Sequence, residues 1–343
     1  MPVKNFERLN TTTDTTTTKT LLHESIPVTG SILSGTYSDE NVKNYTHGMF
    51  QSVYDYPYLS SSANHIMDFS IGFDEASVLS SSANLTQGSK KINMYNQFSQ
   101  VLLGYTGSDN QVRKFESDLL LDGVGSMGEA FFVSFSRLIT KDQVKKGSVS
   151  LTLGTGSWAA PFATVRTLTD SASSDVGGVA STIGGDYGIL KEDVSGDAYG
   201  VVFYQAGIAV LTSSAFAAVS DFYSASAGTG SVDSTFVSAS ISASCDALRH
   251  RIQNVSFNNT TEINSTIYFC RAPHNKFNYS SNPTYTSAGK VQVKTIATDT
   301  PVSYITTVGL YNSSKELLAT AKLSEPLRKD PTNEVTLRVR LDY

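Results

Sequence analysis

The feature that most restricts the fold is an alternation of apolar and polar residues at the end of this 343-residue chain. The alternating residues are, on one side, Val335, Leu337, Val339 and Leu341 and, on the other, Thr336, Arg338, Arg340 and Asp342. Because successive side chains of a β-strand point to opposite faces, this pattern predicts a strand with one buried face. Runs at 263–270, 291–296, 302–311 and 317–323, separated by turn residues, indicate a C-terminal β-sandwich over residues 256–343.

The composition agrees with a β-rich folded protein. Hydrophobic residues make up 40% of the chain and charged residues 17%, which excludes a wholly disordered protein. Ser and Thr account for roughly a quarter of all residues, and they favour strands, turns and helix caps over long exposed helices. We therefore predict an α+β, β-rich fold in which a mixed strand and helix central region, residues 31–255, precedes the C-terminal β-sandwich.

The first 30 residues form a Thr-rich segment without helical or strand periodicity. Such a segment cannot bury enough apolar surface to fold alone, so residues 1–30 are expected to be a flexible N-terminal arm. Two interpretations stay open, a floppy terminus or an arm that becomes ordered on a neighbouring subunit.

Two helices and one hairpin are predicted in the central region. Apolar residues at helical spacing in 91–103 predict a helix that ends at Gly104, and those in 231–253 predict a longer one. Two apolar runs within 201–211 flank the sequence Gln-Ala-Gly, a spacing typical of a hairpin.

The rest of the central region is predicted as strands and loops. Residues 129–139 and 149–153 have the pattern of strands, with a short helix from Thr140 to Gly147 between them. The aromatic-rich stretch 34–89 favours short helices and loops packed through their rings. Residues 170–185, rich in Gly and Ser, are expected to form a loop or an irregular hairpin.

Charge and hydropathy restrict the classes of partner. The formal charge of −5 and a pI near 5.6 provide no basic footprint, so no direct nucleic-acid partner is expected. No apolar run approaches the roughly 20 residues that span a bilayer, and the polar start has no signal-peptide core. We therefore expect a soluble, unsecreted chain without a membrane partner, in which Cys245 and Cys270 are reduced thiols.

Two short motifs resemble ligand-binding loops but lack the context that their chemistry requires. The sequence from Gly123 to Gly128 has the letters of a dinucleotide-binding fingerprint, but a strand pattern follows it where a helix should receive the pyrophosphate. Asp193 to Asp197 resembles the start of a calcium loop, yet Ala198 stands where glycine is required. The first is expected to bind no cofactor, and the second to be a polar turn.

A zinc site and a carboxylate pair are the remaining chemical alternatives. Cys245 with His250 and Cys270 with His274 could supply zinc ligands, but residues five apart on a helix point about 140° away from each other. A glycosidase needs no local motif, and four carboxylates lie in one region: Asp186, Glu192, Asp193 and Asp197. Acidic residues near glycine are more typical of solvated turns. We therefore expect no catalytic residue, no cofactor and no metal ligand.

The C-terminal region resembles a known class of protein. Tyr304–Asn312 (YITTVGLYN) is followed by Glu316–Lys322 (ELLATAK), by Pro326 and by the final strand pattern. This succession resembles tail and baseplate structural proteins of large contractile-tailed bacteriophages. Asn93–Gln97 (NMYNQ) and Ile267–Ala272 (IYFCRA) are also similar to virion proteins of such phages, including those that infect cyanobacteria.

The resemblance implies a structural protein of the virion, from the tail, baseplate or neck, whose partners are other virion proteins and copies of itself. Under this hypothesis the β-sandwich is a docking surface, the aromatic residues from Tyr54 to Phe73 are interface anchors, and the arm joins adjacent subunits. One alternative is a receptor-binding module in which exposed tyrosines stack on host-surface glycans. Another is a polysaccharide-degrading enzyme that uses Glu192 and Asp197.

Overall fold

The computed structural model describes residues 6–29, 39–82, 85–105, 111–225, 228–279, 286–287, 290–291, 296, 298 and 300–343. They form an α+β fold rich in strands, as the composition predicted. The chain divides into two units: unit 1 comprises residues 1–21 and 262–343, and unit 2 comprises residues 22–261. Within the described ranges, no helix has the length and apolar content needed to cross a membrane.

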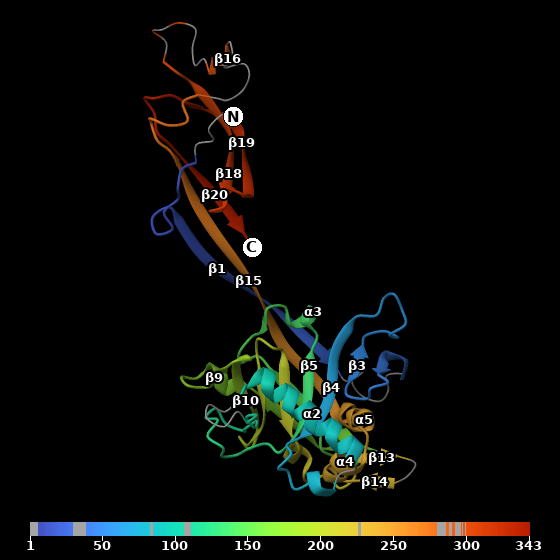
Figure 1. The fold of residues 1–343 in the computed structure, drawn as a ribbon. Helices are drawn as coiled ribbons and strands as arrows, with labels where there is room; N and C mark the ends of the chain where they lie inside the picture. The colour runs from blue at the N-terminus through green and yellow to red at the C-terminus, as the bar shows by residue number, and fades with distance from the viewer. Residues whose placement is uncertain are drawn as a thin grey trace. The chain divides into compact units, whose positions relative to one another are not determined.

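One large antiparallel sheet forms the centre of unit 2 (Figure 1). In spatial order its strands are β15 (Ile252–Ala272), β7 (Ser150–Gly154), β8 (Val165–Thr169), β10 (Gly185–Glu192), β11 (Ala198–Phe203), β12 (Ile208–Thr212), β5 (Glu129–Phe135), β4 (His65–Phe73), β3 (Gln51–Tyr54) and β2 (Val42–Asn44). Strand β15 begins in unit 2 and continues into unit 1.

Shorter elements complete unit 2. The additional strands are β6 (Gln143–Val144), which pairs with β15, β9 (Val179–Thr182), which pairs with β10, and the pair β13 (Tyr223–Ala225) and β14 (Gly228–Gly230). The short helices are α3 (Arg137–Thr140), η1 (Asp39–Asn41), η2 (Ser80–Ser82), η3 (Pro161–Ala163), η4 (Ser171–Ser174) and η5 (Ser213–Phe216).

Helices pack on both faces of the sheet at β5. On one face lies α2 (Leu85–Leu102), whose Phe98 stacks on Phe132 with ring centroids 4.2 Å apart. On the other face lie α4 (Val232–Ser238) and α5 (Ile241–Arg251), and Phe236 of α4 contacts Phe131 at 5.0 Å. Because Phe131 and Phe132 are neighbours in one strand, their rings point to opposite faces, and both are fully buried. The core of unit 2 therefore has two aromatic-rich halves.

The contact between α2 and the sheet requires a glycine at position 72 of β4. A Cβ atom on Gly72 would lie 2.6 Å from the carbonyl oxygen of Lys91 and 2.7 Å from the amide nitrogen of Tyr95. Both are backbone atoms of α2, so no side-chain rotation relieves the overlap. The hydroxyl of Tyr95 donates to the carbonyl oxygen of Met127 at 2.8 Å, which ties the helix to the segment before β5.

Unit 1 contains strands and loops in its described part. Both β1 (Thr15–Thr29) and β20 (Val335–Asp342) pair with β15, and β20 does so from Asp342 opposite Ser265 to Val335 opposite Ala272. A separate antiparallel hairpin is formed by β18 (Ser303–Tyr311) and β19 (Leu317–Lys329). The remaining pair is β16 (Thr286–Ser287) and β17 (Lys290–Val291).

Several predictions from sequence are confirmed. Helix α2 contains the predicted helix up to Leu102, and Gly104 adopts a φ of +81°, as a helix-terminating glycine does. Strands β11 and β12 form the predicted hairpin, with Gly207 at a φ of +67°. In β20 the apolar residues are the more buried ones at every second position. The strand predicted at 149–153 is β7.

The prediction of a flexible arm is wrong for residues 15–29, which form strand β1. Thr favours extended backbone, and pairing with β15 satisfies backbone groups without requiring an apolar face. Residues 1–21 group with 262–343, so the structure divides differently from the predicted parts 1–30, 31–255 and 256–343.

The prediction for the aromatic-rich stretch is wrong in its described part, where β3 and β4 are strands rather than short helices and loops. Strand β4 lies between β3 and β5. Its apolar residues Met67, Phe69, Ile71 and Phe73 alternate with Asp68, Ser70 and Gly72, so the pattern of a strand was present in the sequence. The strand predicted at 291–296 falls outside the described residues except for Val291 and Ile296.

Two predicted helices have different limits. The helix expected from Thr140 to Gly147 lies earlier in the chain, as α3. Ser136 caps its start by accepting a hydrogen bond from the amide of Leu138, the helix ends at Thr140, and Gln143–Val144 form strand β6. The helix expected over 231–253 is interrupted after α4, where Ser240 caps the start of α5 by accepting from the amide of Ala243.

We expect Gly72→Ala to lower the free energy of unfolding by about 1–3 kcal/mol, because the added methyl group overlaps the backbone of α2. Chemical denaturation of the full chain measures the change. Gly128→Ala is the matched control, since its Cβ would meet nothing nearer than the Cβ of Ser77 at 3.9 Å. Equal stability of the two variants would contradict the close contact.

Candidate assembly surface

Unit 1 buries very few of its apolar side chains. In its described part, the buried hydrophobic residues are Ala272 and Val339. Every buried residue of the two hydrophobic cores belongs to unit 2. The apolar positions of β18, β19 and β20 are therefore covered only in part, although these strands have the alternation of a packed sheet.

The hairpin β18–β19 exposes large apolar side chains. Tyr304 is 60% exposed and Leu318 is 69% exposed. Near the turn, Tyr311 pairs with Leu317, and Phe6 packs edge-on against the Tyr311 ring with centroids 5.0 Å apart. We call these exposed residues the hairpin surface: Phe6, Tyr304, Tyr311, Leu317, Leu318 and Leu327.

The same hairpin has open strand edges. In the described part of the chain, β18 and β19 pair only with each other, so one edge of each carries unpaired backbone groups. A long unpaired edge is a template for the addition of a strand from another chain. An isolated two-stranded hairpin is also only marginally stable in water. Both properties favour a covering partner.

A hollow of about 390 Å³ lies elsewhere in unit 1, lined by Thr13, Phe269, Arg271, Glu334 and Thr336. Asp14 forms an ion pair with Arg271 at 3.0 Å, and its carbonyl oxygen accepts a hydrogen bond from the amide of Phe269 at 2.9 Å. These contacts hold the residues before β1 against β15 and shape the rim of the hollow.

The two units carry opposite net charge. By sequence, unit 1 has 13 Lys and Arg residues against 9 Asp and Glu residues, whereas unit 2 has 13 against 22. Exposed basic residues of unit 1 include Lys322, Arg328, Arg338 and Arg340 in β19 and β20. An acidic protein surface is the electrostatic complement of unit 1.

The aromatic residues predicted as interface anchors are divided by the structure. Phe69 and Phe73 are fully buried in β4 and belong to the core of unit 2. Tyr56 and Tyr58, in the turn between β3 and β4, are exposed. The anchor hypothesis therefore fails for the phenylalanines, and the hairpin surface, missed in the sequence analysis, is the larger exposed set. The sequence did indicate exposure here, because Leu317 and Leu318 are adjacent in a strand and their side chains must point to opposite faces.

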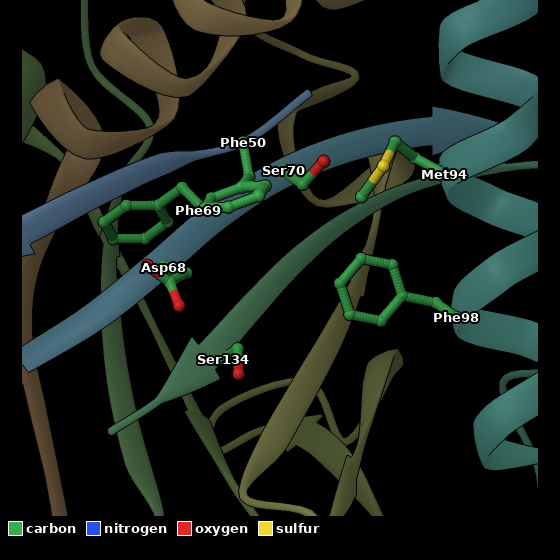
Figure 2. A pocket seen from close by; sticks show the side chains of 7 residues that line it. All are labelled: Phe50, Asp68, Phe69, Ser70, Met94, Phe98 and Ser134. Carbon is green, nitrogen blue, oxygen red and sulfur yellow. The ribbon is translucent and has the colours of Figure 1, made fainter. Parts of the chain in front are cut away.

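A small hollow in unit 2 lies between α2 and the strands β4 and β5. Figure 2 shows Met94 and Phe98 extending from α2 toward Asp68, Ser70 and Ser134. Its volume of about 140 Å³ is below the roughly 300–1,000 Å³ of small-molecule sites. Asp68 is already bonded, accepting from Ser52 Oγ at 2.5 Å and lying 2.8 Å from His65 Nε2.

Of the residues considered for zinc, Cys245 and His250 lie in unit 2 and Cys270 and His274 in unit 1, and the two in unit 2 have other contacts. Cys245 is fully buried, burial raises the pKa of its thiol, and it donates to the carbonyl oxygen of Phe69 at 3.3 Å. His250 stacks on Trp158 with ring centroids 4.1 Å apart. The pair is therefore not arranged as metal ligands.

The carboxylates considered for glycoside cleavage are divided by the structure. Asp186 and Glu192 lie near opposite ends of β10, about 20 Å apart along an extended strand. Glu192 and Asp197 lie in one turn, where the amide of Glu192 donates to the carbonyl oxygen of Asp197 at 2.9 Å. Asp186 pairs with Lys146 at 2.6 Å, and the hydrogen bond from this lysine lowers the pKa of the carboxyl. For Glu192, a hydrogen bond from Ser195 and the pairing with Arg166 lower the pKa, whereas a general acid requires a raised one.

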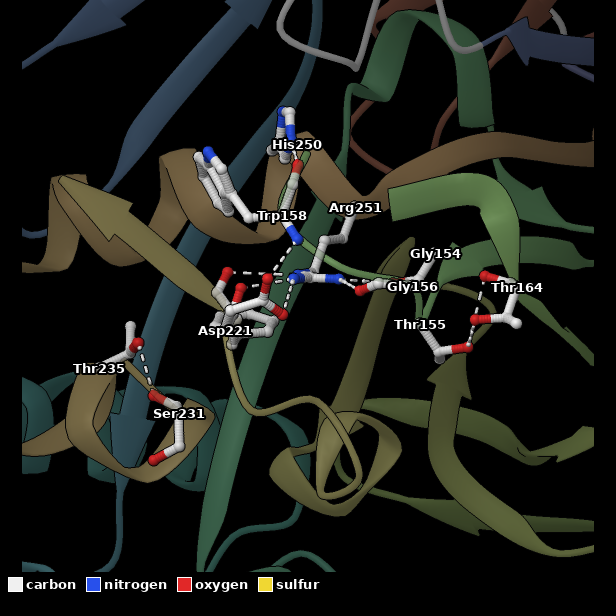
Figure 3. Close-up of polar contacts among 11 residues, drawn as sticks. Gly154, Thr155, Gly156, Trp158, Thr164, Asp221, Ser231, Thr235, His250 and Arg251 are labelled. Carbon is white, nitrogen blue, oxygen red and sulfur yellow. Dashed lines mark hydrogen bonds and ion pairs between the residues drawn. The ribbon is translucent and has the colours of Figure 1, made fainter. Parts of the chain in front are cut away.

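Among the described residues, Arg251 is the largest fully buried side chain, and a cluster of polar contacts surrounds it (Figure 3). Its guanidinium group is fully buried and donates to four backbone carbonyl oxygens at 2.8–3.2 Å, those of Gly154, Gly156, Asp221 and Phe222. The Asp221 carboxylate lies 3.9 Å from Nη2 and accepts from the amide of Trp158 at 2.7 Å. Backbone carbonyls thus occupy the donors of Arg251, so we interpret this cluster as a structural clamp.

Lys91 is a second buried cation of unit 2. Its ammonium group donates to the carbonyl oxygens of Thr235, Phe236 and Ala239, at the C-terminal end of α4. Burial lowers the pKa of Lys91 to about 8. Because all three donors have carbonyl partners, the lysine caps the helix and joins α2 to α4.

One group of side chains in unit 2 has the composition of a metal site. The carboxylate oxygens of Glu116, Asp118 and Asp122 lie within 4.8 Å of one another. Burial raises the pKa of Glu116, and the charges of Asp118 and Asp122 raise it further. This group was not predicted from the sequence, because the spacing of its three acidic residues matches no standard metal-binding motif.

Comparison with known proteins identifies no family. No protein-family model matches the chain, no curated protein is significantly similar to it, and no solved structure matches it significantly. The functional features are therefore those of the chain itself: the uncovered strands and basic charge of unit 1, and the acidic charge of unit 2.

We expect Arg251→Met to lower the free energy of unfolding by about 3–5 kcal/mol, because it leaves four buried carbonyl oxygens and the Asp221 carboxylate without their partner. Arg137→Met is the control, since this exposed arginine donates one hydrogen bond, to the carbonyl oxygen of Gln205. Its effect should stay within about 0.5 kcal/mol. Similar urea denaturation midpoints for both variants would contradict the clamp.

Proposed function

We propose that this protein is a structural subunit of a tailed-bacteriophage virion, in the tail, baseplate or neck, and that unit 1 is its docking module. The observation that carries the proposal is the uncovered hairpin β18–β19, which combines exposed apolar side chains with open strand edges. The resemblance to phage tail and baseplate proteins, centred on residues 304–326, falls on this same hairpin.

A partner would supply what unit 1 lacks. Covering apolar side chains in another chain removes their surface from water, and a paired edge satisfies backbone groups. The basic charge of unit 1 favours an acidic partner surface, and unit 2 of a second copy has such a surface. We therefore assign unit 2 of a neighbouring copy as the partner of unit 1. Such a head-to-tail contact generates a ring or a helical array.

A second candidate function is recognition of host-surface glycans. The exposed tyrosines of unit 1, Tyr279, Tyr304, Tyr311 and Tyr343, favour it, because aromatic faces stack on sugar rings. Specific saccharide binding by the isolated protein on a glycan array would favour this function over assembly.

The direct test of the virion assignment is mass spectrometry of purified phage particles. We expect the chain in multiple copies per particle, because an assembly subunit repeats with the symmetry of its ring. A reconstruction of the particle should then show a neighbouring chain against β18–β19. Absence of the chain from purified particles contradicts the proposal.

Replacing Leu317 and Leu318 together by Ser should weaken assembly and leave the fold intact, because both side chains are exposed in the free subunit. Sedimentation velocity should show reduced self-association of this variant, and thermal unfolding should be unchanged. The control replaces Leu21, an exposed leucine of unit 1 in β1 that lies outside the hairpin surface, by Ser. If both variants associate as the parent protein does, the hairpin surface has no part in assembly.

A further inference from the structure

We propose that unit 2 contains a calcium-binding site formed by Glu116, Asp118 and Asp122, in the loop between Phe115 and β5. The three side chains come from seven consecutive residues, and their carboxylate oxygens lie within 4.8 Å of one another. Like charges at this separation repel, so a bound cation would relieve a repulsion built into the loop. This inference does not depend on the virion assignment.

The loop backbone orients all three carboxylates. Loop amides donate to one oxygen of each: Gly123 to Glu116 Oε1 at 2.9 Å, Leu120 to Asp118 Oδ1 at 3.0 Å, and Val124 to Asp122 Oδ1 at 2.9 Å. The turn that allows this has two residues with positive φ, Leu121 at +54° and Gly123 at +93°.

Two buried polar atoms of unit 2, one of them in the cluster itself, have no hydrogen-bond partner among the described residues. Glu116 is only 5% exposed, and its Oε2 has no hydrogen-bond partner among the described residues. The hydroxyl of Tyr187, a residue 1% exposed, also has none there. Burial raises the pKa of this hydroxyl, and the charges of Glu116 and Asp118 raise it further. Buried polar atoms are rarely left without a hydrogen-bond partner, so these unpaired atoms indicate that a ligand binds here.

Basic side chains do not neutralise the cluster. Among the described residues, none of the ion pairs involves Glu116, Asp118 or Asp122. The neighbouring Lys114 pairs with Asp74 at 2.5 Å. A buried carboxylate without a positive partner is costly, and a divalent cation supplies that partner.

The ligand set favours calcium over other metals. All three side chains offer oxygen, the ligand of hard cations, and none offers the nitrogen or sulfur typical of zinc sites. Calcium binds oxygens at about 2.3–2.6 Å, so oxygens up to about 5 Å apart fit one coordination sphere. Magnesium binds at about 2.0–2.1 Å and demands near-ideal octahedral geometry. Loop carbonyls and water would complete the larger calcium shell.

A cation here would act on the core of unit 2. Phe115 and Met127, at the two ends of the loop, are buried, and the amide of Met127 donates to the carbonyl oxygen of Phe115 at 2.6 Å. The amide of Phe115 donates to the hydroxyl of Tyr95 in α2 at 3.1 Å. Calcium would therefore link the loop to the contact between α2 and the sheet.

The test uses the full chain, stripped of metal with a chelator and titrated with calcium chloride in a calorimeter. We expect saturable binding and a calcium-dependent rise of the melting temperature. Replacing Asp118 and Asp122 together by Asn keeps the acceptor oxygens for Leu120 and Val124 but removes two charges. This variant should bind calcium about tenfold more weakly or worse. Without metal it should melt no lower than the parent, because repulsion is reduced.

The matched control replaces Asp193 and Asp197 by Asn, which removes the same charge from the polar turn after β10. This control should bind calcium as the parent does. Terbium luminescence sensitised by nearby tyrosine provides a second readout, and it should be lost only in the Asp118 and Asp122 variant. Absence of calcium binding by the parent, unchanged binding by that variant, or equally tight binding of magnesium would each overturn the assignment.

Discussion

The fold of unit 2 depends on the burial of both faces of the paired strands β4 and β5. Phe131 and Phe132 place rings on opposite faces of the sheet, where they meet α4 and α2 respectively. The close approach of α2 is allowed only because Gly72 presents no side chain to the helix backbone. Buried cations then lock the surrounding segments: Lys91 binds the end of α4, and Arg251 binds the carbonyls around η3 and β13.

Unit 1 is held together in a different way. Its strands have their backbone pairing, and its N-terminal segment is fixed through Asp14. Its buried residues include polar ones such as Lys329, which donates to Asn278 and to backbone carbonyls. The apolar residues of the hairpin surface lie outside this arrangement. A unit that leaves strand edges unpaired and apolar side chains uncovered is suited to docking, and this is why we propose assembly as its role.

Local sequence patterns were sufficient to predict three elements of the fold. The alternation in β20, the hairpin at Gly207 and the helix ended by Gly104 were all predicted, because each depends on a few neighbouring residues. Strand β4 was missed although Met67, Phe69, Ile71 and Phe73 alternate with Asp68, Ser70 and Gly72, because the surrounding aromatic and Ser-rich residues favoured short helices and loops. Strand β1 was missed because it is largely polar and owes its structure to pairing with the distant β15.

The sequence by itself determined the fold class, the final strand, and the Val-Gly-Leu-Tyr hairpin on which the proposed assembly function rests. Only the tertiary structure decided which apolar residues stay uncovered, since exposure depends on contacts with segments far apart in the chain. The same holds for the loop from Glu116 to Asp122, because the spacing of its acidic residues in the sequence matches no standard metal-binding motif. The turn of the folded loop brings the three carboxylates close together, and only the tertiary structure shows this.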